Sequence, residues 1–224
     1  MGKEIDLSIF VINFDRFDYM KRTVDSVYET FYQIDKEVIL LDDGSSMQTR
    51  KKIIEYKKDT ERLDSLVFGE KRSNWSEYFQ YMLDNANGKF CIWLENDWIF
   101  TKKQEEFFPA SKNILENHPL IGQIIWRVDN NEYWKSINKI DKEDYFLVEQ
   151  GFEYHNTLGE YTNNPHLFLT ERHREFLSPV PNSSGPRMFE IVMGRHYHER
   201  GFKSAYVGTD SFVEHIGGVS NATW

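Results

Sequence analysis

The stretch FCIWLENDW, residues 90–98, decides how the rest of the chain is interpreted. Its first five residues are apolar, which is typical of a strand buried on both faces of a sheet. The apolar run then stops at two acids that flank an amide, Glu95-Asn96-Asp97. In an open α/β sheet ligands bind at the carboxyl ends of the strands, and a hard divalent cation takes oxygen ligands there. The stretch indicates either a ligand site or solvated loop acids that happen to follow a strand.

The composition is that of a soluble globular protein with one continuous core. The chain has 224 residues, of which 40% are apolar and 28% charged, and its net charge is −9. This charge counts against a nucleic-acid partner and against an anionic membrane surface. An anionic substrate would therefore need a local cation. Aromatic residues make up 16% of the chain, and some of them are candidates for lining a groove.

No feature of the sequence indicates export or membrane insertion. Cys91 is the one cysteine, so no intrachain disulfide can form, and this fits a reducing compartment. The charged N-terminal residues lack the apolar segment of a signal peptide. No apolar run approaches the length of a transmembrane segment. We therefore expect a cytoplasmic protein without a transmembrane segment.

Strand and helix patterns alternate through the first hundred residues. Apolar runs predict strands at 7–12, 37–41, 66–68 and 90–94, and amphipathic or capped segments predict helices at 19–32, 47–58 and 75–85. Repeated strand–helix units specify a parallel sheet with right-handed crossovers. The expected fold class is therefore α/β.

Polar clusters follow three of these strands. Asn13-Phe14-Asp15-Arg16 follows the first, Asp42-Asp43-Gly44-Ser45-Ser46 the second, and Glu95-Asn96-Asp97 the fourth. A doubly wound sheet places such clusters side by side along one edge. Three clusters in register are harder to explain by accident than one.

The second half is less regular. Helices are predicted at 107–117, 171–177 and 188–200, and short strands at 121–126, 166–170, 203–207 and 211–213. Residues 129–165 read as loops and short strands of the kind that build a substrate wall. Residues 179–186 read as a loop, and the last strand leads into Glu214-His215.

With these pieces in order, the chain resembles a known family. Residues 9–16 look like its opening strand and turn, and Asp42-Asp43-Gly44-Ser45 matches its Asp-Asp-Gly-Ser motif. Residues 72–75 and 86–90 resemble the lead into its metal strand, and Leu94-Glu95-Asn96-Asp97 stands where it carries Asp-x-Asp. Residues 188–190, 195 and 201–202 resemble its late acidic helix, and residues 213–215 its closing histidine. The family is the inverting GT-A glycosyltransferases, in particular family two.

The resemblance implies a GT-A (nucleotide-diphospho-sugar transferase) fold, with a mostly parallel central sheet flanked by helices. It implies a single domain over 1–224, with a nucleotide-binding half at 1–100 and an acceptor-binding half at 101–224. The implied activity is metal-dependent, inverting transfer of a sugar from a nucleotide diphosphate sugar, most simply a UDP-sugar, to a glycan or other hydroxyl acceptor. Here Asp15, Glu95 and Asn96 depart from the family pattern, and Glu190 stands alone where the family has an acidic pair.

Several site residues follow from the resemblance. Asp97 and His215 are the expected metal ligands, and an imidazole beside a carboxylate favours Mn²⁺ over Mg²⁺. Asp42 is expected to accept the uracil N–H, or else to cap a helix. The wider set of expected nucleotide contacts is Phe14, Asp15, Arg16, Asp42, Arg72, Asn74, Glu95 and Asn96.

The same residues have plainer interpretations. Phe14 can stack on the base or belong to the core, and Arg16 and Arg72 can reach the nucleotide or form surface ion pairs. Glu95 can act through water or on the ribose, and Asn96 can bind ribose hydroxyls or serve as a turn residue.

Inversion needs a general base for the acceptor hydroxyl, and the resemblance assigns this role to Glu190. The alternative is an acid placed at a helix N-terminus for the helix dipole. Residues of the irregular half that can line an acceptor groove, or else fill core and surface, are Trp126, Arg127, Trp134, Tyr145, Tyr154 and Tyr161.

Two other classes stay open. A nucleotidyltransferase shares a related sheet, but it usually has a glycine-rich phosphate loop after the first strand, and residues 13–16 contain no glycine. A non-catalytic module that binds carbohydrate or nucleotide is the other alternative.

Overall fold

The computed structural model describes residues 5–70, 75–127, 139–142, 145–148, 161–183, 185–208 and 210–217. Its strands are β1 (Leu7–Asn13), β2 (Lys36–Asp42), β3 (Ser65–Phe68), β4 (Phe90–Glu95), β5 (Trp98–Phe100), β6 (Ile121–Ile125), β7 (Lys139–Asp141), β8 (Phe146–Val148), β9 (His166–Leu169), β10 (Lys203–Tyr206) and β11 (Val213–His215). Its helices are α1 (Phe17–Thr30), α2 (Met47–Thr60), α3 (Trp75–Asn85), the 3-10 turn η1 (Gln104–Glu106), α4 (Phe108–Asn117), α6 (Thr170–Leu177) and α7 (Gly185–Glu199).

A nine-stranded sheet organises the described part of the chain, in the order β3-β2-β1-β4-β9-β6-β10-β8-β7. Strands β1 to β4 are parallel, as are β6 and β10. The predicted α/β fold with a mostly parallel central sheet is therefore confirmed. Strand β9 runs antiparallel to both of its neighbours, β4 and β6, a reversal that strand–helix alternation does not predict.

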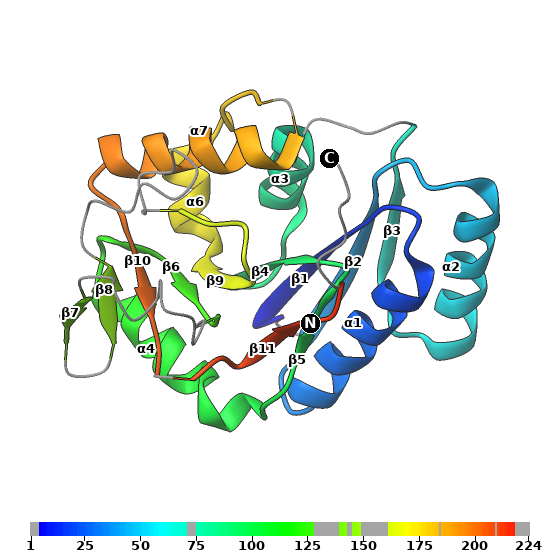
Figure 1. The fold of residues 1–224 in the computed structure, drawn as a ribbon, viewed down its shortest axis with the longest axis horizontal. Helices are drawn as coiled ribbons and strands as arrows, with labels where there is room; N and C mark the ends of the chain where they lie inside the picture. Colours follow the sequence, from blue (N-terminus) through cyan, green and yellow to red (C-terminus); the bar gives the residue numbers. More distant parts are fainter. Residues whose placement is uncertain are drawn as a thin grey trace.

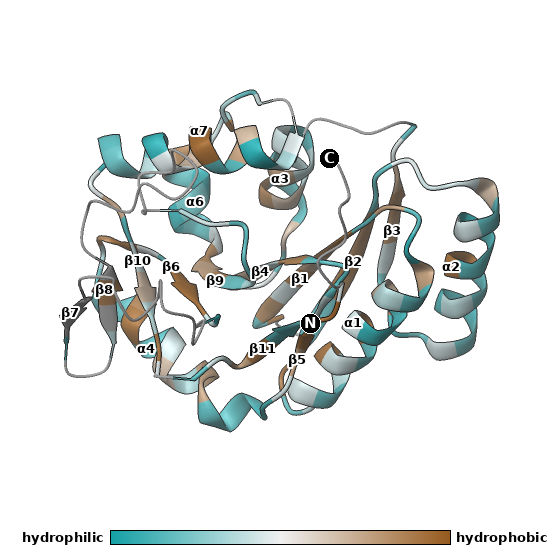
Figure 2. Ribbon diagram, viewed as in Figure 1, coloured by the Kyte–Doolittle hydropathy of each residue, from teal (hydrophilic) through white to brown (hydrophobic). Residues whose placement is uncertain are grey.

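Two hydrophobic cores cover the two faces of this sheet. Alternate residues of β1 face opposite sides: Leu7, Ile9 and Val11 join the core under α1, α2 and α4, whereas Phe10 and Ile12 join the core under α3, α6 and α7. In Figure 1 the helices α3, α6 and α7 lie together on one side of the sheet, and α1 and α2 lie on the other. Figure 2 shows hydrophobic residues along the central strands and a mixture on the surrounding helices.

The sheet order brings the predicted polar clusters together. Because β2 and β4 flank β1, the carboxyl ends of the three strands are neighbours, and the register pairs Asn13 with Asp42 and Ile12 with Glu95. The predicted alignment of the three clusters along one edge is thus confirmed.

Several boundaries differ from the sequence prediction, and two of these belong to the elements that carry Glu190 and His215. Helix α7 begins at Gly185, three residues before its predicted start, since Pro186 suits the first turn of a helix. The last strand lies at Val213–His215 instead of 211–213, and it pairs antiparallel with β5 in a separate two-stranded sheet. Within the described residues, no helix has the length and apolarity needed to cross a membrane.

Candidate active site

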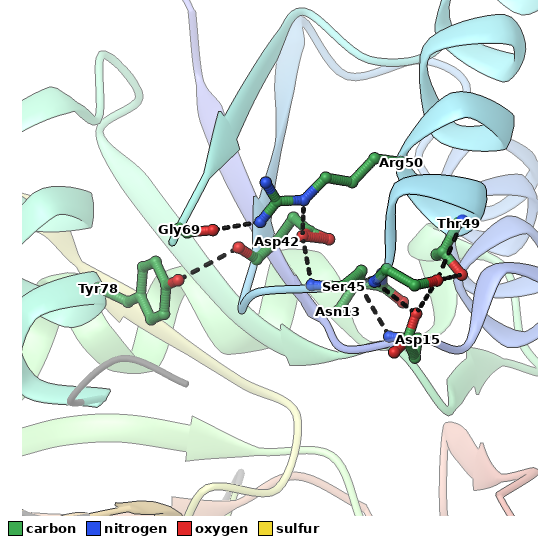
Figure 3. A network of polar contacts seen from close by, with 9 residues as sticks. Asn13, Asp15, Asp42, Ser45, Thr49, Arg50, Gly69 and Tyr78 are labelled. Carbon is green, nitrogen blue, oxygen red and sulfur yellow. Dashed lines mark hydrogen bonds and ion pairs between the residues drawn. The ribbon is translucent and has the colours of Figure 1, made fainter. Parts of the chain in front are cut away.

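Asp42 ends β2 with a fully buried side chain. Its Oδ1 accepts hydrogen bonds from the backbone N–H of Ser45 at 2.9 Å and from Nε of Arg50 at 3.2 Å. Its Oδ2 is also buried but has no hydrogen-bond partner among the described residues. Figure 3 shows the carboxylate of Asp42 in contact with Ser45 of the same cluster and with Arg50 of α2. A buried acceptor without a partner is costly, and this one can take an N–H from a ligand.

The first two polar clusters are tied to each other and to the third. Asn96 donates from Nδ2 to Oδ1 of Asn13 at 2.7 Å, and Asn13 donates from Nδ2 to Oγ of Ser45 at 3.3 Å. The same Oγ accepts the backbone N–H of Asp15 at 2.8 Å. Oδ1 of Asp15 in turn accepts from both the backbone N–H and the hydroxyl of Ser46, each at 2.8 Å. This chain of bonds fixes the relative positions of the three loops, and Figure 3 shows the part of it that joins Asn13, Asp15 and Ser45.

These contacts change how Asp15 and Asn96 are interpreted. Asp15 has a left-handed backbone, with φ of 49°, which Asp tolerates better than most residues. Burial acts to raise the pKa of Asp15, but the hydrogen bonds from Ser46 outweigh it and lower that pKa below its ordinary value. Asn96 is buried in the turn between β4 and β5, and its amide nitrogen is used by Asn13. In this arrangement Asn96 is a turn residue whose amide nitrogen is bonded to Asn13.

Asp97 belongs to the third cluster, and it contacts residues near the end of the described chain. One of its carboxylate oxygens, Oδ2, accepts from Nη1 of Arg16 at 2.7 Å and lies 3.3 Å from Nε2 of His215. Its other oxygen, Oδ1, is buried without a hydrogen-bond partner among the residues that the structure describes. Gly217 lies against the same carboxylate, since a Cβ at this position would be 2.4 Å from Oδ2. The two predicted metal ligands are therefore side by side.

The pairing of β5 with β11 explains why His215 reaches Asp97. The register sets His215 opposite Trp98, and their ring centroids are 4.8 Å apart. The backbone N–H of Ile216 donates to the carbonyl of Asp97 at 2.8 Å, which closes the turn onto the strand pair. Both strands have only three residues, so the contact depends on long-range pairing.

Asp97 and His215 suit a cation whose remaining coordination positions are filled by a bound substrate. No group of three or more His, Cys, Asp or Glu side chains able to hold a metal occurs among the described residues. Magnesium-like ions are often held by one or two protein carboxylates together with substrate phosphates. The unpaired Oδ1 of Asp97, the imidazole of His215 and the close approach of Gly217 suit such a site.

Glu95 and Glu190 are close enough to influence each other. Burial raises the pKa of Glu95 to about 8, with further contributions from Asp97 and Glu190, while Arg16 acts to lower it. Glu190 lies in the second turn of α7, where its Oε1 accepts the backbone N–H of Asn163 at 3.0 Å. Asn163 also donates from Nδ2 to the carbonyl of Pro186 at 3.0 Å. The segment before β9 thus holds the start of α7 and the carboxylate of Glu190.

Of the aromatic residues expected to line an acceptor groove, those that the structure describes lie in the core or pack against it. Trp126 is fully buried in the core and donates from Nε1 to Ser111 at 3.0 Å, so its prediction as a groove residue is wrong, because its whole ring is packed. Tyr161 is also core, with 2% exposure, and Tyr145 packs beside His118.

Arg127 lies beside Trp98, the residue of β5 that packs against His215. It donates to Oδ1 of Asn164 at 2.9 Å, and its guanidinium lies 5.0 Å from the ring centroid of Trp98. Phe14 is partly buried between the first strand and Asp15. The predicted residues Arg72, Asn74, Trp134 and Tyr154 lie outside the described residues.

Sequence reasoning missed four residues that shape the site: Asn13, Arg50, Tyr78 and Asn163. The basic residues of α2 read as solvated surface, yet Arg50 binds Asp42. Tyr78 donates from its hydroxyl to the backbone carbonyl of Asp42 at 3.2 Å. A buried Asn at a strand end is a weak but available signal, since buried polar groups need partners.

Comparison with known proteins identifies the family of this chain. The model of one family, described as Glycosyl transferase family 2, matches residues 8–176 of the 224. The chain belongs to this glycosyltransferase family, as the sequence motifs predicted. A curated relative, the uncharacterized glycosyltransferase MG060 of Mycoplasma genitalium, is 26% identical over 105 residues. That match covers 46% of this chain and 35% of the relative.

Solved structures share the GT-A fold. The mannosyltransferase PcManGT from Pyrobaculum calidifontis, in complex with GDP-Man and Mn²⁺, has a TM-score of 0.66 and 13% identity, over 98% of this chain and 59% of that one. GalNAc-T7 with UDP, GalNAc and Mn²⁺ has a TM-score of 0.65 and 17% identity, over 96% and 44%. S. aureus TarS 1-349 in complex with UDP-GlcNAc has a TM-score of 0.62 and 15% identity, over 96% and 62%. The chain thus spans less than two thirds of each of these relatives.

The raised pKa of Glu95 predicts a pH dependence of stability. Because the pKa is about 8 in the folded protein against an ordinary 4.5, the folded state binds more protons than the unfolded state between these values. The wild-type free energy of unfolding should therefore fall, relative to Glu95→Gln, as pH rises from 4.5 to 8, and level off above 8. The relative loss should be on the order of 5 kcal/mol, and urea unfolding at several pH values measures it.

The exposed Glu214 on β11 provides the control. Glu214→Gln should follow the wild-type pH profile. A wild-type profile that runs parallel to that of Glu95→Gln would contradict the buried, protonated Glu95.

Proposed function

We propose that this glycosyltransferase is metal-dependent and inverting, and that it moves a sugar from a UDP-sugar to a hydroxyl of a glycan or other acceptor. One observation carries the proposal. Asp42 and Asp97 are buried carboxylates at the ends of strands on either side of β1, and each keeps one oxygen unpaired among the described residues. In this proposal residues 1–100 bind the nucleotide, and residues 101–224 supply the acceptor side.

The nucleotide would lie along the edge formed by these strand ends. The free oxygen of Asp42 suits the imide N–H of uracil, and Asp97 with His215 would hold a divalent cation beside the diphosphate. When bound, such a cation neutralises the charge that develops on the leaving diphosphate. The mixed carboxylate and imidazole ligands favour Mn²⁺ over Mg²⁺. Arg16, bonded to Asp97 at 2.7 Å, is a second cation for the phosphates.

Glu190 is the proposed general base. Its carboxylate is oriented by the backbone N–H of Asn163, and it is near enough to Glu95 to raise the pKa of that residue. In-line attack requires one group to take the proton of the acceptor hydroxyl as the bond to the sugar forms. Glu190 would take this proton while the diphosphate leaves from the opposite face, which inverts the anomeric carbon.

A donor assay tests the proposal. With Mn²⁺ and a panel of UDP-sugars, the protein should release UDP slowly without acceptor and faster when suitable hydroxyl acceptors are added. Glu190→Gln should lower kcat by about 10²- to 10⁴-fold, because a positioned base contributes this much, with little change in donor affinity.

Glu199→Gln is the matched control, since Glu199 is exposed at the far end of the same helix, and it should keep wild-type kcat. Release of pyrophosphate from UTP and a sugar phosphate would instead indicate a nucleotidyltransferase. Nucleotide binding without any release would indicate a non-catalytic module.

Gly217→Ala tests the cation site through packing. The added Cβ would sit 2.4 Å from Oδ2 of Asp97, so the carboxylate must move. Binding of Mn²⁺ in the presence of UDP, followed by electron paramagnetic resonance, should weaken by about tenfold or more, equivalent to about 1.4 kcal/mol.

Gly201→Ala is the control, because a Cβ there meets nothing within 4 Å although φ is +74°. This variant should lose about 1 kcal/mol of stability and keep its affinity for Mn²⁺. Equal Mn²⁺ affinity in Gly217→Ala and wild type would count against Asp97 as the ligand.

A further inference from the structure

Arg50 reaches from the first turn of α2 to the ends of two strands. Its Nε donates to Oδ1 of Asp42 at 3.2 Å, and its Nη2 donates to the backbone carbonyl of Gly69, just beyond β3. Its guanidinium lies 5.1 Å from the ring centroid of Phe68, in the range of a cation–π contact. Figure 3 shows Arg50 between Asp42 and Gly69. The planar fork of Arg is suited to such simultaneous bonds.

Asp42 is consequently held at almost every polar atom. Its backbone carbonyl accepts from the N–H of Gly69 at 2.8 Å and from the hydroxyl of Tyr78 at 3.2 Å. Its Oδ1 accepts from Ser45 and Arg50. Only Oδ2 is left, buried and without a partner among the described residues. The orientation of that oxygen is therefore fixed by the bonds made to the other one.

Building on the proposed function, we propose that Arg50 is a positioning residue that sets the choice of nucleobase. By pairing with Oδ1 it fixes the rotation of the Asp42 carboxylate, so that Oδ2 is the acceptor left for a ligand. The base that fits has an N–H at the edge facing Oδ2, as uracil has at N3. Cytosine has a lone pair at N3. In the same position this lone pair would face a buried carboxylate oxygen, so two acceptors would repel each other and cytosine would bind more weakly.

Removing Arg50 should weaken this discrimination. Oδ1 of Asp42 would keep only the backbone N–H of Ser45, so the carboxyl could rotate. A carboxyl that can rotate no longer holds an acceptor at one edge of the base, so the preference for an N–H at that edge weakens. Arg50 need not contact the nucleotide for this effect, because it acts through Asp42.

The test is a calorimetric titration of UDP and CDP, with Mn²⁺ present, into wild type and Arg50→Met. Wild type should bind UDP about tenfold or more tighter than CDP, as expected when a charged buried acceptor meets a lone pair instead of a donor. In Arg50→Met the ratio should fall to about threefold or less. Lys51→Met is the matched control, because it removes one exposed positive charge from the next position of the helix, and it should keep the wild-type ratio.

Each outcome bears on a different claim. If Arg50→Met weakens UDP and CDP equally, Arg50 is only structural and the inference is wrong, while the proposed UDP-sugar donor stands. Wild type that binds neither nucleotide, or both equally, contradicts the UDP-sugar donor and the inference with it. Should Arg50→Met fail to fold, Arg50→Lys replaces it: Lys keeps the charge but not the fork, so an intermediate ratio supports the inference and an unchanged ratio overturns it.

Discussion

Two buried carboxylates, each half satisfied, are the constraint on which the site depends. Asp42 ends β2 and Asp97 lies in the turn after β4, and donors among the described residues reach only one oxygen of each carboxylate. Leaving a buried acceptor unpaired costs about 1–3 kcal/mol, and a protein that needed these groups only for stability would gain by pairing them. Their placement on either side of β1 instead suits a ligand that offers a donor at one end and a cation at the other.

The cores on either side of the sheet keep this arrangement rigid. On one side Trp93, Phe79 and Phe189 form an aromatic cluster, with the ring of Phe189 5.3 Å from Phe79 and 6.2 Å from Trp93. Because Phe189 directly precedes Glu190, the packing that anchors α7 to β4 also sets the position of the proposed base. The strand that leads to Asp97 and the helix that carries Glu190 therefore share one core.

Much of the fold and part of the site could be predicted from local pattern. Apolar runs of four or five residues followed by polar clusters identified β1, β2 and β4 and the edge they share, because burial on both faces leaves a clear signal. Strand β5 has three residues and is formed by pairing with β11, which no local period can reveal. Trp126 and Asn96 each kept two interpretations, a ligand contact or a structural role, because sequence does not say whether an aromatic ring or an amide faces inward. Arg50 was missed for the same reason, since one basic residue among several on α2 carries no sign of a buried partner.

The central claim is that distant loops converge on a uridine diphosphate and one cation. A crystal structure of the protein with UDP and Mn²⁺ tests it most directly. We expect Mn²⁺ to be bound by Asp97, by His215 and by diphosphate oxygens. We also expect the uracil N3–H to donate to Oδ2 of Asp42. Nucleotide bound away from the ends of β1, β2 and β4, or Mn²⁺ held by neither Asp97 nor His215, would contradict it.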